Sequence, residues 1–169
     1  ETMVTTDFVV VSGEVTSKAI FDKKAQEELV RKTIREIGYN DKELMFDGDT
    51  CKVDLRLHSQ SPDISQGVTA TEEKEQGAGD QGLMFGYATN ETEELMPMPI
   101  LLAHKLIQKL SEVRRNKTLA WVRPDGKSQV SVKYEDHKPT KIETVVISTQ
   151  HAPEISQEEI SNEIIDKVI

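Results

Sequence analysis

The chain has 169 residues, 36% of them hydrophobic and 30% charged, with a formal net charge of −9. This size supports one moderate domain or pieces of two, and the acidic balance disfavours nucleic acids and anionic membranes as partners. No apolar run approaches membrane length, and a single cysteine, Cys51, excludes an internal disulfide and agrees with a reducing, cytoplasmic setting.

The first half of the chain predicts a strand, a helix and a second strand. Residues 2–15 are rich in Val and Thr and predict one strand. Asp22 is the expected N-cap of a helix that Gly38 ends. Residues 53–58 alternate between apolar and polar side chains, which is typical of a half-buried strand. The apolar residues that share one parity in the first strand are Val4, Phe8 and Val10.

The second half predicts a helix, a hairpin and a final helix. Pro97 begins a helix whose apolar residues recur at helical spacing. Residues 130–134 and 142–148 predict two strands joined by a turn. Ser156 and Glu159 form a capping-box pattern, and the helix that follows runs to Ile169 without a stop signal. The chain is therefore expected to be a fragment of α+β class.

Residues 59–82 show no sustained period, which predicts a long loop that is either functional or a plain disordered connector. Within this segment, Gly77, Gly79 and Gly82 have the spacing G-x-G-x-x-G. A dinucleotide-binding turn must follow a buried strand, and here a charged run precedes the glycines. The glycines instead permit positive φ and place Asp80 where a ligand could reach it.

Taken whole, the run GAGDQGLMFGYAT at residues 77–89 resembles the glycine-rich signature of S-adenosylmethionine synthetases (methionine adenosyltransferases). Four further segments resemble that family in the same order. They are SGEVT at 12–16, SPDISQGV at 61–68, RPDGKSQV at 123–130 and STQH at 148–151.

The resemblance implies two incomplete, similar α+β units of a pseudo-threefold fold. It divides the chain into part of the N-terminal region at 1–59, a mobile active-site loop at 60–75 and a truncated central region at 76–169. It also implies homo-dimers or homo-tetramers with active sites at the subunit interface, Mg2+ and K+ as cofactors, and a cytoplasmic transferase.

The implied reaction joins ATP to L-methionine and then hydrolyses the triphosphate to phosphate and pyrophosphate. A thioether sulfur is already a neutral nucleophile, so the protein must align it with the ribose C5′ and stabilise the leaving polyanion. The resemblance assigns the methionine ammonium to Glu14, a methionine contact to Gln60 and a catalytic role near the sulfonium to Asp80. The alternatives are a solvated strand-end glutamate, a polar hinge and a turn-capping aspartate.

The resemblance assigns ATP binding to Asp125, which would accept from ribose hydroxyls, and to Lys127, which would neutralise phosphate oxygens. The alternative is a plain turn, because Pro-Asp-Gly is a strong turn signal. Glu1 matches a potassium ligand. The histidines are scattered, and His104 is expected to be packed beside apolar helix positions.

The sequence departs from the family in lacking the H-P-D-K and G-G-x-F-S-x-K-D segments, and Asp7 stands where the family has Gly. We therefore expect the fragment to be inactive alone. Two alternative functions remain. The chain would be a non-catalytic binding or assembly module that docks on full-length subunits, or a generic acidic α+β scaffold.

Overall fold

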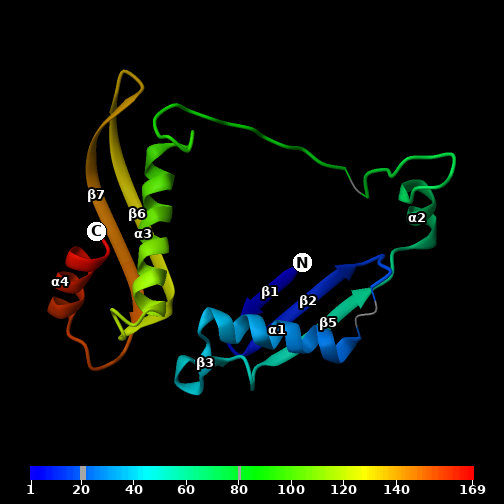
Figure 1. Ribbon diagram of the computed structural model, residues 1–169, viewed down its shortest axis with the longest axis horizontal. Coiled ribbons are helices and arrows are strands. Elements are labelled where there is room, and N and C mark those ends of the chain that lie inside the picture. The colour runs from blue at the N-terminus through cyan, green and yellow to red at the C-terminus, as the bar shows by residue number, and fades with distance from the viewer. Residues whose placement is uncertain (20–21, 80) are drawn as a thin grey trace. The chain divides into compact units, whose positions relative to one another are not determined.

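The computed structural model describes residues 1–19, 22–79 and 81–169, and the chain divides into two compact units, Glu1–Met84 and Phe85–Ile169 (Figure 1). Each unit has its own sheet and helices, so the predicted α+β class is confirmed. Among the described residues, no helix combines the length and apolar character needed to cross a membrane.

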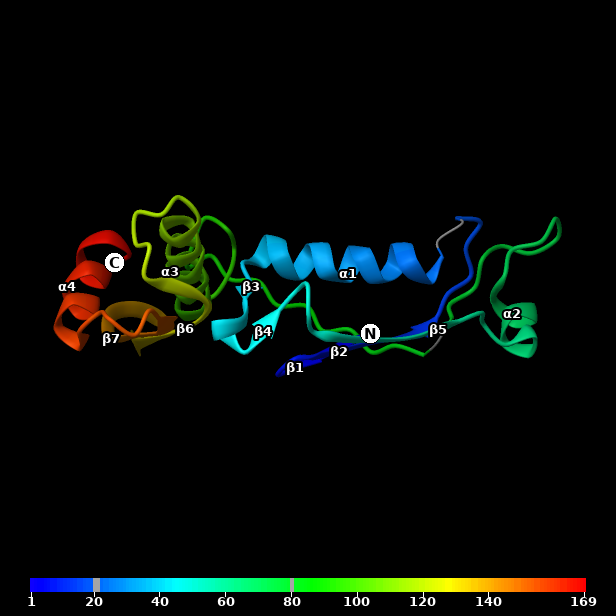
Figure 2. The same cartoon turned by 90° about the horizontal axis from the view of Figure 1, so that it is seen from below.

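The first unit is built on a three-stranded sheet in the order β1–β2–β5. Strand β1 (Thr2–Thr5) pairs antiparallel with β2 (Phe8–Glu14), and β2 pairs parallel with β5 (Lys52–His58). A parallel pair requires a crossover connection, and helix α1 (Lys23–Ile37) supplies it. Figure 2 shows α1 running along one face of this sheet.

The prediction of one strand over residues 2–15 is wrong, because a two-residue turn separates β1 from β2. Asp7 adopts a positive φ of 55° in this turn, a conformation that aspartate tolerates better than most residues. Val9 is the fully buried residue of β2, whereas Val4 is 56% exposed. Residues 8–11 are all apolar, so alternation could not reveal which parity faces the core.

Helix α1 has the predicted ends. The Asp22 side chain accepts a hydrogen bond of 2.8 Å from the Ala25 N–H, and Gly38 ends the helix at a φ of 117°. Ile34 is the buried residue of α1 and packs with Val9 and Cys51 in the core of this unit.

The connection from α1 to β5 folds back against the helix. It contains β3 (Asn40–Asp41), the 3-10 helix η1 (Lys42–Leu44) and β4 (Phe46–Asp47), which pairs antiparallel with β3. The rings of Tyr39 and Phe46 meet edge to face with centroids 5.3 Å apart, and both pack against the core.

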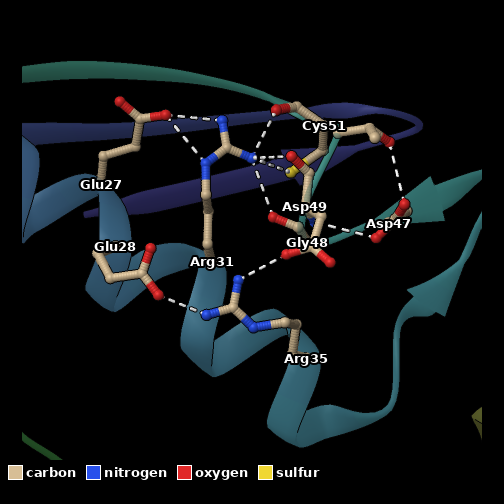
Figure 3. Close-up of polar contacts among 9 residues, drawn as sticks. Glu27, Glu28, Arg31, Arg35, Asp47, Gly48, Asp49 and Cys51 are labelled. Atoms are coloured by element: carbon tan, nitrogen blue, oxygen red, sulfur yellow. Dashed lines mark hydrogen bonds and ion pairs between the residues drawn. The ribbon is translucent and has the colours of Figure 1, made fainter.

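Arg31 of α1 binds the turn that precedes β5 (Figure 3). Its Nη1 donates to the carbonyl oxygens of Gly48 at 2.9 Å, Asp49 at 3.2 Å and Cys51 at 3.1 Å. Glu27, one turn earlier, accepts from Nε and Nη2 at 2.9 and 2.7 Å. One guanidinium therefore satisfies three carbonyls and fixes where β5 begins.

The prediction of a loop throughout residues 59–82 is wrong at residues 62–68, which form the short helix α2 (Pro62–Val68). Pro62 suits the first helical turn because its missing N–H would have no partner there. Two turns are too short to produce a recognisable helical period, so the sequence pattern did not reveal them.

The second unit combines a long hairpin with two helices. Helix α3 (Met98–Arg115) packs on β6 (Val122–Glu135), which pairs antiparallel with β7 (Lys138–His151). Helix α4 (Gln157–Lys167) starts at the predicted capping box of Ser156 and Glu159, and it ends before Ile169. The buried core residues are Leu110, Val113, Leu119, Val122, Ile164 and Val168.

The alternative interpretation of residues 123–126 as a turn is wrong. They lie inside β6, with a register irregularity between Val122 and Gly126 that accommodates Pro124. A Cβ at Gly126 would lie 2.9 Å from Leu110 Cδ2, so glycine lets the strand approach α3. The hairpin turn is at Asp136 and His137, both at positive φ.

Glu91 connects the chain before α3 to the hairpin. Its Oε2 accepts from the Met98 N–H at 3.0 Å and from the Tyr134 hydroxyl at 2.6 Å, while Oε1 accepts from Thr89 at 3.2 Å. The Met98 and Tyr134 bonds lower the pKa of Glu91, and Glu91 raises the pKa of Tyr134 to about 12.

Gly48→Ala tests the approach of the turn to α1. Its Cβ would lie 2.9 Å from the Arg31 carbonyl oxygen, which belongs to helix backbone and cannot move cheaply. We expect the free energy of unfolding to fall by about 1–3 kcal/mol in urea titrations. Gly67→Ala is the control, because its Cβ would meet nothing within 4 Å. Equal stability of the Gly48→Ala variant and the unmodified chain would contradict the packing.

The Glu91→Gln variant tests the hydrogen bonds that Glu91 accepts from Met98 of α3 and Tyr134 of the hairpin, through the pH dependence of thermal stability. The folded pKa of Glu91 is lowered, so its stabilisation is present above the ordinary value of 4.5 and is lost as pH falls through the folded pKa. We expect Glu91→Gln to lower the Tm at pH 7 and the difference to shrink in more acidic buffer. Glu93→Gln, in the same turn, is the control. A Tm difference that is constant with pH would contradict the assignment.

Candidate functional site

The carboxyl ends of β2 and β5 bring together residues that lie far apart in the sequence. In the parallel register Ser12 lies beside Arg56, and Glu14 lies beside His58. The Val15 N–H donates to the His58 carbonyl at 2.8 Å, which extends the ladder past the strand end. Ligands of parallel sheets often bind beyond the carboxyl ends of strands.

The polar residues here share one face of the sheet. Val9, Val11 and Val53 pack toward α1, so side chains of the other parity lie on the opposite face. The second face therefore carries Glu14 and His58. An open hollow of about 690 Å³ lies at this edge. The residues that line it are Glu1, Ser12, Gly13, Glu14, Arg56, Leu57 and His58.

Glu1 joins this hollow through backbone pairing. Its nitrogen donates to the Ser12 carbonyl at 2.7 Å, and the Ser12 N–H donates to the Glu1 carbonyl at 3.0 Å. This pair continues the β1–β2 register by one residue. Two residues assigned from the resemblance, Glu1 and Glu14, therefore line the same hollow.

Ion pairs organise the charged side chains. Glu14 Oε1 lies 3.4 Å from His58 Nε2, and both side chains are exposed. Asp54 accepts from Arg56 Nε through both carboxylate oxygens, at 2.9 and 3.0 Å. The site is thus open to solvent, and the side chains of Glu14 and His58 already lie in contact within it.

A second hollow, of about 520 Å³, adjoins the first and shares Leu57 and His58 with it. Its remaining lining residues are Val15, Ser17, Ala19, Gln26 and Ser59. Val15, Ala19 and Leu57 give it an apolar surface next to the charged one. This arrangement suits a small ligand with a charged end and an apolar side chain.

Gln60 lies two residues beyond β5 and is half-buried. Its Oε1 accepts a 2.8 Å hydrogen bond from the Ser61 N–H, just before α2 begins. The acceptor is therefore in use in this structure. Asp80, the residue assigned near the sulfonium, lies outside the described residues.

Asp125 and Lys127 lie in β6 of the second unit. They are both exposed and are separated by one residue, so they share the strand face opposite α3. Between and beside them, Gly126 and Ser128 face α3, and the Ser128 hydroxyl donates to the Ala103 carbonyl at 2.7 Å. An acid and a cation are thus presented side by side from a rigid strand.

Sequence analysis did not identify Arg56 and His58 as site residues. Their alternation in the strand pattern placed them on a polar face, but only the parallel pairing with β2 brings them to Glu14.

The expectation that His104 is packed is wrong, because it is exposed on α3. Among the residues described, no three His, Cys, Asp or Glu side chains group as a metal site.

Two segments of the sequence match models of known protein families. Residues 1–62 match the model of the S-adenosylmethionine synthetase N-terminal domain, and residues 75–169 match the model of the central domain of the same enzyme. The two matches occur in the order expected from the five motifs and together cover most of the chain. The chain belongs to the S-adenosylmethionine synthetase family.

Proposed function

We propose that this chain serves the synthesis of S-adenosylmethionine from ATP and L-methionine, with hydrolysis of the triphosphate to phosphate and pyrophosphate. The observation that carries the proposal is the position of Glu14, a carboxylate beside an open hollow at the carboxyl ends of two parallel strands. Family membership supplies the reaction, and this geometry supports a role for Glu14 as the partner of the substrate ammonium.

The methionine would occupy the two adjoining hollows. Glu14 would bind the ammonium, Gln60 would contact the amino acid through its amide, and the apolar hollow at Val15 and Leu57 would receive the thioether chain. Residues 60–75 would close over the substrates and exclude water. Asp80 would oppose the positive charge as the sulfonium forms. The sulfur attacks C5′ directly, so no side chain has to remove a proton from it.

Asp125 and Lys127 would contact ATP. Asp125 would accept hydrogen bonds from ribose hydroxyls, and Lys127 would neutralise oxygens of the leaving triphosphate. Their common strand face and exposure support the assignment, since two neighbouring groups of one molecule can meet both side chains at once.

Magnesium and potassium are the proposed cofactors, and the described residues fit them unequally. Glu1 lines the first hollow and would offer one carboxylate to potassium. For magnesium, no group of three or more acidic, His or Cys side chains occurs in the described parts of the chain.

The wider assignments follow the family. We propose a cytoplasmic enzyme that works as a homo-dimer or homo-tetramer with sites at the subunit interface. The proposed regions are part of the N-terminal region at 1–59, the mobile active-site loop at 60–75 and the truncated central region at 76–169.

The alternative is a non-catalytic module that docks on catalytic subunits. Under both hypotheses the chain by itself gives no product with ATP, methionine and magnesium. The module would be distinguished by raising product formation when mixed with an active subunit, as measured by mass spectrometry.

Paired substitutions test the two binding roles. Lys127→Ala should weaken ATP binding and leave methionine binding unchanged, because it removes one charge-assisted contact, typically about 1.5–3 kcal/mol. Glu14→Ala should weaken methionine binding and leave ATP binding unchanged. Isothermal titration calorimetry with each ligand measures both effects.

The matched control is Lys133→Ala, which removes an exposed lysine of the same strand that pairs with Glu135 at 2.7 Å. It should alter neither affinity. If Lys127→Ala and Glu14→Ala weaken the same ligand, the separation into an ATP contact and a methionine contact is wrong. If Lys127→Ala changes neither affinity, Lys127 is a solvated strand lysine.

A further inference from the structure

The charges around the first hollow are separated by sign across the sheet. Glu1 and Glu14 lie on the side of β1 and β2, while Arg56 and His58 lie on β5. Ser12 stands between Glu1 and Arg56 in the register. The hollow therefore has an acidic side and a basic side. Their nearest members, Glu14 and His58, lie on the neighbouring strands β2 and β5.

This separation matches the dimensions of an α-amino acid, whose ammonium and carboxylate are attached to the same carbon. Neighbouring strands lie about 4.8 Å apart. The Glu14 and His58 side chains close that gap to 3.4 Å between Oε1 and Nε2. A zwitterion placed over β2 and β5 would meet the Glu14 carboxylate with its ammonium and the Arg56 and His58 side chains with its carboxylate.

Arg56 has hydrogen-bond donors that are available to bind a carboxylate. Asp54 binds only its Nε, through both carboxylate oxygens. Within the described portion of the chain Nη1 and Nη2 contact no partner, and the side chain is 72% exposed. Asp54 thus holds the guanidinium from one side, while its outer nitrogens keep the planar geometry that suits a bidentate carboxylate.

We propose that Arg56 and His58 bind the carboxylate of the amino acid whose ammonium binds Glu14, so that this hollow selects a free, zwitterionic α-amino acid. The inference rests on the proposed function, because it takes methionine as the ligand of Glu14. In the free protein His58 contacts Glu14. When the amino acid binds, its ammonium pairs with Glu14 and His58 donates a ring N–H to the carboxylate.

The test compares L-methionine with L-methioninol, which keeps the ammonium and thioether but replaces the carboxylate by a hydroxymethyl group. The affinity of the isotope-labelled chain for each is measured by NMR titration. We expect the unmodified chain to bind methionine at least about tenfold more tightly, the effect of one charge-assisted contact. Arg56→Gln and His58→Gln should each reduce this preference, and Glu14→Gln should weaken both ligands.

Lys52→Gln is the matched control, because it removes a cation from the same face of β5 at a position that does not line the hollow. Its preference for methionine should equal that of the unmodified chain, and thermal melts should show that all variants fold. If Lys52→Gln reduces the preference as much as Arg56→Gln does, overall charge is responsible and the proposal is overturned.

The outcomes also distinguish this inference from the proposed function. Equal affinity of the unmodified chain for both ligands, with both weakened by Glu14→Gln, would overturn the carboxylate site and leave the ammonium contact intact. Binding of neither ligand, or no effect of Glu14→Gln, would overturn the ammonium contact and the carboxylate site together.

Discussion

The hydrogen bonds of Arg31 to the turn before β5 are the constraint on which the first unit depends. The carbonyls of Gly48, Asp49 and Cys51 all point to one guanidinium nitrogen, so the turn has one favourable position against α1. That position sets where β5 starts and therefore which residues of β2 and β5 lie side by side. A slip of one residue would move every side chain of β5 to the other face.

The register of β2 and β5 has a direct consequence for the site. It places Glu14 beside His58 and Ser12 beside Arg56 on the face away from α1. The same alternation sends Val9 and Val53 into the core, so the packing that stabilises the sheet also orients the charged side chains. Core packing and the presentation of the polar face are therefore two results of one register.

The second unit also presents charged side chains on the sheet face away from its helix, but it does so with an antiparallel hairpin. Here an antiparallel hairpin presents Asp125 and Lys127 on the face opposite α3, because Gly126 and Ser128 face the helix. The bulge between Val122 and Gly126 absorbs Pro124, which has no N–H to donate to a regular ladder. Glu91 then ties the start of α3 to Tyr134 of the hairpin. In the proposed reaction the nucleophile needs no activation, so such fixed placement of charges would be the main contribution of the protein.

The sequence by itself determined the α+β class, the ends of α1 at Asp22 and Gly38, the capping box at Ser156 and the family. These features depend on residues within a few positions of one another, so local chemistry is sufficient to recognise them. Tertiary structure decided the division of residues 2–15 at Asp7, the buried parity of β2 and the strand conformation around Asp125. It alone brought Arg56 and His58 to Glu14, because that neighbourhood arises from hydrogen bonds between strands more than 40 residues apart, which no local pattern encodes.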